Sequence, residues 1–202
     1  MAETVALVDY GAGNLHSVQN ALKAAGAERI AVTSDPKLVT TADRIVLPGV
    51  GAFGAAMQAL ADVPGMIDAL NETVLAKCRP FLGVCVGMQL MADSGEEHGQ
   101  TQGLGWCRGT VRALTPRADL KVPHMGWNDV RPVAAHPLVE AGEAYFLHSF
   151  AYDGADVLAE TDHGGPVVAA IGRDNLAGVQ FHPEKSQRYG IELLRRFLTW
   201  RP

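Results

Sequence analysis

A cysteine between two glycines is the side chain of this 202-residue sequence whose setting most favours chemistry. The run Gly83-Val84-Cys85-Val86-Gly87 follows an apolar segment, and Met88-Gln89-Leu90-Met91 after it favours a helix. A nucleophile flanked in this way between a strand and a helix is typical of a nucleophile elbow, a sharp, strained turn that presents the reactive atom. The helix N-terminus favours a thiolate, and the N–H of Val86 can reach an oxyanion. Cys85 is therefore predicted to be a nucleophile, with a buried structural cysteine as the alternative.

A thiol that transfers acyl groups needs a base and a leaving-group acid, and His182 is the best candidate for both. It lies in Val179-Gln180-Phe181-His182-Pro183-Glu184, at the end of an apolar run. This position would bring it to the same carboxyl edge of the sheet as Cys85. Pro183 stiffens the link to Glu184, whose carboxylate can then orient the imidazole. Alone, the tripeptide also fits a loop with a surface acid, but with the elbow it predicts a Cys-His-Glu site.

A third segment, Leu47-Pro48-Gly49-Val50-Gly51, contains two glycines and also follows an apolar run. Its glycines leave backbone N–H groups open to a ligand and permit unusual peptide orientations. An oxyanion needs such donors, and removing one typically costs about 10²–10³ in turnover. The alternative is a plain turn between a strand and a helix, since the run does not match a phosphate-binding fingerprint.

Composition limits the function classes more than it selects one. The length predicts a single domain over residues 1–202, and the content of 48% hydrophobic and 19% charged residues is ordinary for a globular protein. A net charge of -5 gives no reason to expect nucleic acid or an anionic membrane as partner. We expect neither a membrane span nor a signal peptide. The odd set of three cysteines favours a reduced, cytoplasmic setting, with Cys78 and Cys107 as structural residues.

Hydrophobic period and turn residues predict alternating strands and helices in the first half. We expect strands at 4–8, 29–32, 44–47 and 80–84, and helices at 15–25, 54–61 and 66–77. After a loop at 95–105, strands are predicted at 107–114, 145–150, 157–160, 167–171 and 176–180, with a closing helix at 187–200. The predicted fold class is α/β: a three-layer, open, mostly parallel, flavodoxin-like sheet flanked by helices, with additional β-strands in the C-terminal half.

Six motifs, in order along residues 9–186, resemble those of a known family. The chain resembles class I, triad-type glutamine amidotransferases through Pro48-Gly49-Val50-Gly51, the elbow with Met88-Gln89, and Phe181-His182-Pro183-Glu184. Within that class it is similar to the glutaminase subunits of imidazole glycerol phosphate synthase. The motifs that carry this closer likeness are Asp9-Tyr10-Gly11-Ala12-Gly13-Asn14-Leu15, His124-Met125-Gly126-Trp127-Asn128 and Tyr145-Phe146-Leu147-His148-Ser149-Phe150. Val86 replaces a usual leucine and Phe150 a frequent tyrosine, and neither change touches the triad.

The resemblance implies a reaction and a set of site residues. Cys85 would attack the side-chain amide of glutamine, His182 would protonate the departing ammonia, and water would cleave the thioester. The ends of the substrate would be held by Gln89, Glu97 and main chain near Gly49, Ser149 and Phe150. The oxyanion donors would be Val50, Gly51 and Val86, and the peptide at Val50 would reorient when partner and ligand bind. Neither a cofactor nor a metal is implied.

The resemblance also implies a heterodimer that makes imidazole glycerol phosphate and AICAR in histidine biosynthesis. A (β/α)8-barrel cyclase/synthase subunit would receive the ammonia through a tunnel. Seven residues match family positions at or near the interface: Asn14, His124, Trp127, Asn128, Tyr145, His148 and Lys185. A core position is the alternative for Trp127, and a metal site for the two histidines lacks a third ligand at useful spacing. Three further histidines are predicted to be solvated or packing residues: His16, His136 and His163.

Three other functions compete with this interpretation. The chain could serve another synthase, such as the one for pyridoxal phosphate, or act as a γ-glutamyl hydrolase, but the motifs at 9–15 and 124–128 argue against both. A redox-sensing or chaperone-like protein of related fold would need only a reactive cysteine and leaves His182 and Glu184 unexplained. A metal-dependent hydrolase lacks ligand spacing.

Overall fold

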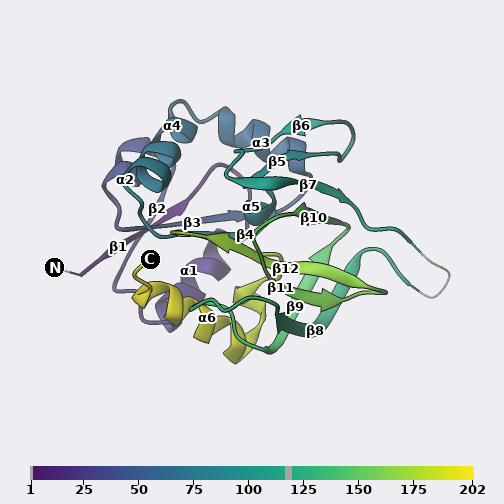
Figure 1. Ribbon diagram of the computed structural model, residues 1–202. Coiled ribbons are helices and arrows are strands. Elements are labelled where there is room, and N and C mark those ends of the chain that lie inside the picture. Colours follow the sequence, from purple (N-terminus) through teal and green to yellow (C-terminus); the bar gives the residue numbers. More distant parts are fainter. Residues whose placement is uncertain (1, 117–119) are drawn as a thin grey trace.

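The computed structural model describes residues 2–116 and 120–202, and five parallel strands form one half of its main sheet (Figure 1). They lie in the order β2-β1-β3-β4-β13, so their carboxyl ends share one edge. Every residue of β3 and β4 is buried, as expected for strands covered on both faces. The strands are β1 (Thr4–Val8), β2 (Arg29–Thr33), β3 (Arg44–Gly49), β4 (Phe81–Cys85) and β13 (Leu176–Val179).

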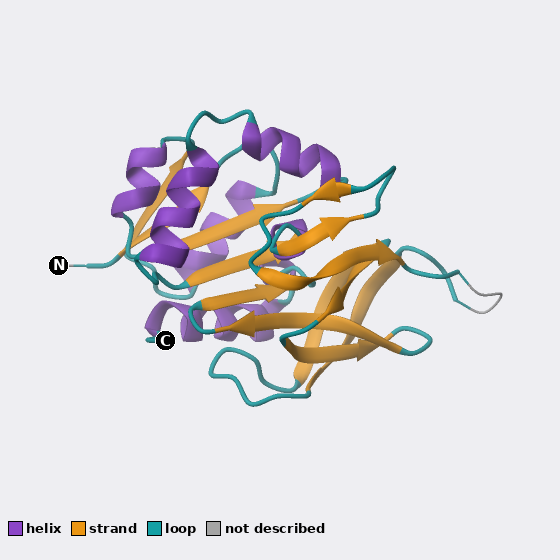
Figure 2. Cartoon of the chain, turned by 45° about the horizontal axis from the view of Figure 1, so that its top comes forward, coloured by secondary structure: helices purple, strands orange, loops and turns teal. Residues whose placement is uncertain are grey.

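Antiparallel strands extend this sheet beyond β13 in the order β12-β11-β8-β9 and complete nine strands. A second, four-stranded sheet in the order β10-β7-β5-β6 lies beside it (Figure 2). The added strands of the main sheet are β8 (His124–Pro132), β9 (Gly142–His148), β11 (Val157–Asp162) and β12 (Pro166–Arg173). Those of the second sheet are β5 (Ala92–Gly95), β6 (Thr101–Gln102), β7 (Cys107–Ala113) and β10 (Phe150–Gly154).

Helices cover both faces of the parallel half and confirm the three-layer α/β prediction (Figure 1). One layer holds α1 (Leu15–Ala24) and α6 (Gln187–Thr199), which contact each other. The other holds α2 (Pro36–Thr41), α3 (Phe53–Ala61) and α4 (Met66–Leu70), with α4 continuing into a π-helical turn (Asn71–Ala76). No helix in the described part of the chain is long and apolar enough to cross a membrane.

Some element boundaries differ from the predictions. The strand expected to end at residue 47 continues through Pro48 to Gly49, because both residues pair in parallel with β4. The strand expected at 145–150 is divided at Ser149 into β9 and β10, which belong to different sheets. The loop expected at 95–105 contains part of the short hairpin of β5 and β6.

Besides the hairpin strands β5 and β6, helix α2 and strand β8 were not predicted. Helix α2 has six residues and buries only Val39, so it shows too few turns for a helical period. Strand β8 has three glycine or polar residues on its inner face, His124, Gly126 and Asn128, and this masks the alternation of a half-buried strand. The helix expected at 88–91 is α5 (Val86–Gln89), which begins directly after Cys85.

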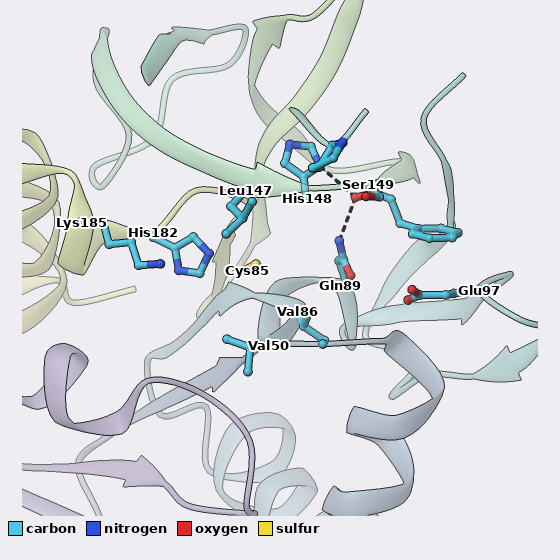
Figure 3. Close-up of a pocket in the computed structure, with 13 residues that line it drawn as sticks. Val50, Cys85, Val86, Gln89, Glu97, Leu147, His148, Ser149, His182 and Lys185 are labelled. Atoms are coloured by element: carbon cyan, nitrogen blue, oxygen red, sulfur yellow. Dashed lines mark hydrogen bonds between the residues drawn. The ribbon is translucent and has the colours of Figure 1, made fainter. Parts of the chain in front are cut away.

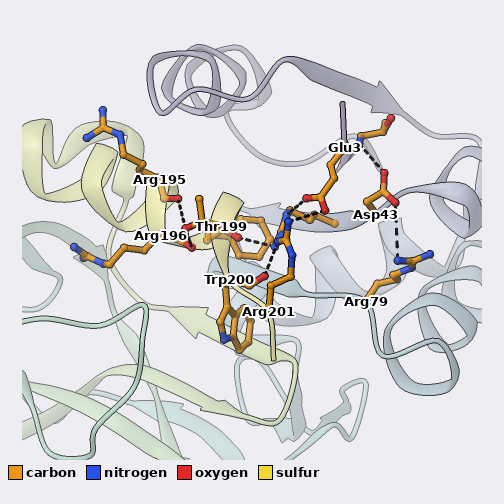
Figure 4. Close-up of polar contacts among 11 residues, drawn as sticks. Glu3, Asp43, Arg79, Arg195, Arg196, Thr199, Trp200 and Arg201 are labelled. Atoms are coloured by element: carbon orange, nitrogen blue, oxygen red, sulfur yellow. Dashed lines mark hydrogen bonds and ion pairs between the residues drawn. The ribbon is translucent and has the colours of Figure 1, made fainter. Parts of the chain in front are cut away.

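A buried arginine ties the two chain ends together on the far side of the sheet (Figure 4). Arg44 donates from Nη1 to the carbonyl of Phe197 at 2.7 Å and from Nε to Glu3 Oε2 at 2.9 Å. Arg201 binds the other oxygen of Glu3 at 2.8 Å. The last turn of α6 is thereby held against the start of the parallel sheet, and one carbonyl at its C-terminus gains a charged donor.

The elbow can form only because its two glycines leave room for neighbouring backbone. A Cβ on Gly87 would overlap the carbonyl oxygen of Leu47, and one on Gly83 would lie 2.6 Å from the carbonyl oxygen of Gly87. The turn after β4 is thus packed against the end of β3 at backbone-to-backbone distance. Packing therefore explains the Gly-x-Cys-x-Gly pattern at both positions.

We expect Gly87→Ala to lower the free energy of unfolding by at least about 2 kcal/mol, because backbone rather than a flexible side chain must yield. Urea denaturation and the melting temperature measure the loss. Gly54→Ala is the matched control, since its Cβ would meet only the side chain of Thr101, with the hydroxyl at 3.0 Å, and a helical site gains about 1 kcal/mol from alanine. Equal stability of the two variants would show that the close contact at Gly87 is not needed.

Candidate active site

Cys85 closes β4 in a strained backbone conformation, with φ of 54° and ψ of -113°. Positive φ is uncommon for residues other than glycine, and such strain concentrates at functional sites. The side chain is 4% exposed at the bottom of a cavity. Helix α5, which begins directly after Cys85, has only four residues.

His182 lies across from Cys85 (Figure 3), and both His182 and Glu184 follow the carboxyl end of neighbouring strand β13. His182 Nδ1 is 2.8 Å from Glu184 Oε1, and Cys85 lies close enough to the imidazole to raise its pKa. The two side chains of the His-Glu pair are 5% and 2% exposed. The structure thus brings the three predicted triad residues together at one end of the cavity.

Main-chain bonds to β9 hold this histidine in place. The N–H of His182 donates to the carbonyl of Tyr145 at 2.9 Å, and the N–H of Tyr145 donates to Ser186 Oγ at 2.9 Å. Ser186 Oγ in turn donates to the carbonyl of His182 at 2.6 Å. A single turn of 3-10 helix (Pro183–Lys185) lies within this bracket, which explains how a short Pro-containing link aims Glu184 back at the imidazole.

Electrostatics favour a proton on His182. Burial lowers its pKa, but hydrogen bonds with Cys85 and Glu184 and their charges outweigh burial and raise the pKa to about 9. At neutral pH the imidazole is therefore in its protonated, charged form, between the sulfur atom of Cys85 and the carboxylate of Glu184. That arrangement suits a group that must deliver a proton to a leaving amine.

A cavity of about 300 Å³ opens above the triad (Figure 3). The expected oxyanion residues and most of the expected substrate-binding residues line it: Val50, Gly51, Val86, Gln89, Glu97, Ser149 and Phe150. Gly49 does not, because it is packed against the backbone of Gly87 and the hydroxyl of Tyr10. His148 and Lys185, expected at an interface, also line the cavity, as do Pro123 and Leu147, which were not predicted.

The loop after β3, which was expected to bind the oxyanion, is anchored where it leaves the strand and is exposed at its tip. The hydroxyl of Tyr10 donates to the carbonyl of Pro48 at 2.8 Å and anchors the loop where it leaves β3. Val50 at the tip is 44% exposed. Gly51 has φ of 85°, and a Cβ at this position would meet no atom within 4 Å. Gly51 is therefore required for backbone conformation rather than for space.

Gln89 and Glu97 each use one half of the side chain to stabilise the cavity wall. Gln89 Nε2 donates to the carbonyl of Phe150 and to Gln180 Oε1, both at 3.0 Å. Glu97 Oε2 accepts from the N–H of Phe53 at 2.8 Å, at the start of α3. The remaining oxygen of each side chain is left for a ligand.

Gln180 is a site residue that was not predicted from the sequence. It is fully buried, binds Gln89, and places its Nε2 3.8 Å from the sulfur of Cys85. A fully buried amide is costly unless it is hydrogen-bonded. The contacts of Gln180 meet this need and join Gln89 on the cavity wall to the sulfur of Cys85. Its position inside the apolar run before His182 was the available signal.

An apolar surface lies beside the mouth of the cavity. Met125 and Trp127 on β8 pair with Leu147 and Tyr145 on β9, and Met125 and Trp127 are 66% and 48% exposed. Lys185 Nζ lies 5.7 Å from the centre of the Tyr145 ring. We call these five residues the docking face. Because Leu147 and Lys185 also line the cavity, the docking face and the cavity mouth are continuous.

The other expected interface residues differ in exposure: Asn14 is exposed, whereas His124 and His148 are buried. His124 and His148 are 4% and 7% exposed: paired opposite each other, they face inward on β8 and β9, behind the surface of these strands. Asn14 caps α1 by accepting from the N–H of Ser17. Among the described residues no group of three or more His, Cys, Asp or Glu side chains could hold a metal ion.

Comparison with known proteins agrees with this geometry. Residues 6–200 match the family model for glutamine amidotransferase class-I. The chain belongs to the class-I glutamine amidotransferase family. It is 60% identical to a protein of Zymomonas mobilis subsp. mobilis named imidazole glycerol phosphate synthase subunit HisH, over 100% of this chain and 98% of that one. A protein of the same name from Rhodopseudomonas palustris is 53% identical, over 98% and 100% of the two chains.

Solved structures support the fold at low sequence identity. A crystal structure described as glutamine amidotransferase superposes with a TM-score of 0.74 at 17% identity, covering 96% of this chain and 97% of that one. The structure of PurLQS from Thermotoga maritima gives a TM-score of 0.67 at 20% identity, over 98% and 99% of the chains. The fold is therefore shared among proteins whose sequences have diverged widely.

The His182–Glu184 pair predicts a specific dependence of stability on pH. Folded His182 has a pKa of about 9, above its usual 6.5, so the folded state keeps a proton that the unfolded chain releases in this range. The stabilisation is complete below about pH 6.5 and is lost as the pH rises through about 9. Glu184→Gln weakens this linkage. We expect the difference in unfolding free energy between wild type and variant to shrink from about pH 6 to about pH 9.5 in urea titrations.

Glu192→Gln is the matched control. Glu192 pairs with Arg188 at 3.6 Å and Arg195 at 3.3 Å on the surface of α6, where ion pairs contribute little. Its effect should not change across this pH window. A Glu184→Gln difference that stayed constant with pH would contradict the coupling between the carboxylate and His182.

Proposed function

We propose that this chain is the glutaminase subunit of an imidazole glycerol phosphate synthase and releases ammonia from L-glutamine for a partner subunit. The observation that carries the proposal is the proximity of Cys85, His182 and Glu184 at the bottom of a cavity lined by polar side chains. The names of the full-length relatives supply the synthase. Three free cysteines agree with a reducing, cytoplasmic setting.

The proposed reaction proceeds through a thioester. The sulfur of Cys85 attacks the side-chain amide carbon of glutamine, and the N–H groups near Val50, Gly51 and Val86 bind the negative oxygen that develops. His182 gives its proton to the nitrogen, and ammonia departs as the C–N bond breaks. Water then gives a proton to His182 and adds its hydroxide to the thioester. The C–S bond then breaks and glutamate leaves. Cys85 and the protonated His182 are thereby returned to the state they had before the attack.

Charge and hydrogen bonding on the cavity wall suit the two α-groups of glutamine. The oxygen of Glu97 that does not bind Phe53 can accept from the α-ammonium group, and the open oxygen of Gln89 can do the same. Backbone N–H groups near Ser149 and Phe150 can donate to the α-carboxylate. A cavity of about 300 Å³ accommodates a small amino acid and excludes a long peptide.

The docking face gives the ammonia a destination. We place the (β/α)8-barrel synthase subunit on Met125, Trp127, Tyr145, Leu147 and Lys185, because aromatic and Met side chains are enriched in interface cores. The relatives are named as subunits, which implies a second chain. Since the docking face reaches the cavity mouth, a partner seated there would cover the exit from Cys85 and receive ammonia directly.

Removing the nucleophile tests the chemistry. Cys85→Ser should lower glutamate release by about 10³-fold or more, because a serine in this geometry lacks the acidity of the thiol. Cys78→Ser, at an exposed thiol away from the cavity, should behave as the wild type. Release is measured with the chain alone and with the synthase subunit and its nucleotide substrate, where we expect a higher rate. Activity that survives Cys85→Ser would refute the mechanism.

Trp127→Ala tests the docking face. An aromatic anchor at the centre of an interface typically contributes about 2 kcal/mol, so we expect binding to the synthase subunit to weaken at least about tenfold in calorimetric titrations. Leu75→Ala removes a comparably exposed apolar side chain from the π-helical turn after α4 and should leave the affinity unchanged. Equal affinities for the two variants would place the partner on another surface.

A further inference from the structure

A row of polar side chains runs behind the cavity wall, from the docking face to the substrate pocket. His148 Nδ1 lies 2.9 Å from the carbonyl oxygen of Phe150, and His148 Nε2 lies 3.0 Å from His124 Nδ1. His124 Nε2 lies 3.0 Å from Asn128 Nδ2, which also lies 2.7 Å from the carbonyl oxygen of Asp162. These four contacts join strands β8, β9 and β11 in one line.

The chemistry of the groups permits one direction for every proton in this row. A carbonyl only accepts, so His148 Nδ1 must carry the hydrogen that points at Phe150. The Nε2 atom of a neutral His148 must then accept, and His124 Nδ1 must donate to it. His124 Nε2 is left as an acceptor, and the amide of Asn128 donates to it and to Asp162. The amide orientation is consistent, since Asn128 Oδ1 accepts from the N–H of Asp129 at 2.9 Å.

Burial supports the neutral forms that this assignment requires. It lowers the pKa of His124 to about 3, with the nearby His148 and His163 acting in the same direction. It lowers the pKa of His148 to about 4, against the raising effect of the bond to Phe150. Both rings are therefore uncharged at neutral pH, and each acts as one donor and one acceptor.

The carbonyl at the inner end of the row belongs to the substrate wall. Phe150 accepts from both His148 and Gln89, and its segment lies at the division between β9 and β10 (Figure 3). Gln89, Phe150 and Ser149 all line the cavity. At the outer end, Asn128 follows Trp127 of the docking face directly in β8.

We propose that His148, held by His124 and Asn128, is a positioning residue that fixes the Phe150 carbonyl and the Gln89 amide for the α-groups of glutamine. The inference rests on the proposed function and deepens it, because it links the docking face to substrate affinity through hydrogen bonds of defined direction. Cys85 and His182 lie outside the row. Its loss should therefore weaken recognition of glutamine and leave the reactivity of the thiol intact.

His124→Phe is the sharpest test. It keeps the flat ring that stacks on Phe146 and His163, at centroid distances of 4.7 and 4.2 Å, and removes both nitrogens. In a Cys78→Ser background, which lacks the exposed thiol, Cys85 is labelled with two reagents and the adduct is mapped by mass spectrometry. The glutamine analogue 6-diazo-5-oxonorleucine needs the substrate wall, whereas iodoacetamide needs only the sulfur.

We expect His124→Phe to slow labelling by the analogue and to raise the KM for glutamine by about five- to tenfold, the effect of one buried hydrogen bond. Labelling by iodoacetamide and kcat with the synthase subunit present should stay near wild type. Asn128→Leu removes the outer donor and should likewise slow labelling by the analogue and raise the KM for glutamine. This variant replaces His124→Phe in the test if His124→Phe does not fold.

His163→Phe is the matched control, since His163 stacks on the same ring, and the one hydrogen bond of its ring to the described residues is with the carbonyl of Lys121. It should label as the wild type does with both reagents. Wild-type rates in His124→Phe and Asn128→Leu, an equal loss with both reagents, or an equal effect of His163→Phe would each overturn the inference. If the analogue failed to label the wild-type chain, the proposed function itself would fail.

Discussion

The backbone of Gly87 lies against the carbonyl of Leu47, and the rest of the site depends on that contact. It brings the turn after β4 onto the end of β3, so the nucleophile and the oxyanion loop meet at one point of the sheet. The same approach forces Cys85 into a strained conformation that the buried strands on both sides must maintain. The hydrophobic core therefore supplies the energy that holds the reactive atom in position.

The two halves of the main sheet contribute different parts of the site. The parallel half supplies Cys85, the proposed oxyanion loop and the loop that carries His182, because the carboxyl ends of its strands share one edge. The antiparallel half supplies the opposite wall and an apolar outer surface through β8 and β9. Main-chain bonds from Tyr145 to His182 and Ser186 join the halves, so His182 rests on the strand that also carries the docking face.

The sequence predicted those parts of the structure that depend on neighbours along the chain. The proximity of the proposed triad residues could be predicted because Cys85 and His182 each follow an apolar strand and Glu184 follows within two residues. The role of Gln180 could not, since it depends on hydrogen bonds to residues about 90 positions away. The burial of His124 and His148 was missed for a related reason: only the pairing of β8 with β9 turns both rings inward.

The bond network around Arg44 holds both ends of the chain near the amino edge of the parallel strands, opposite the edge that carries the site (Figure 4). A short peptide could join them without crossing the active-site edge, which makes the fold a natural subject for circular permutation. For the same reason an affinity tag or a surface tether at either terminus leaves the cavity mouth free. The molecule can thus be immobilised by its ends while its opposite edge remains open to substrate and partner.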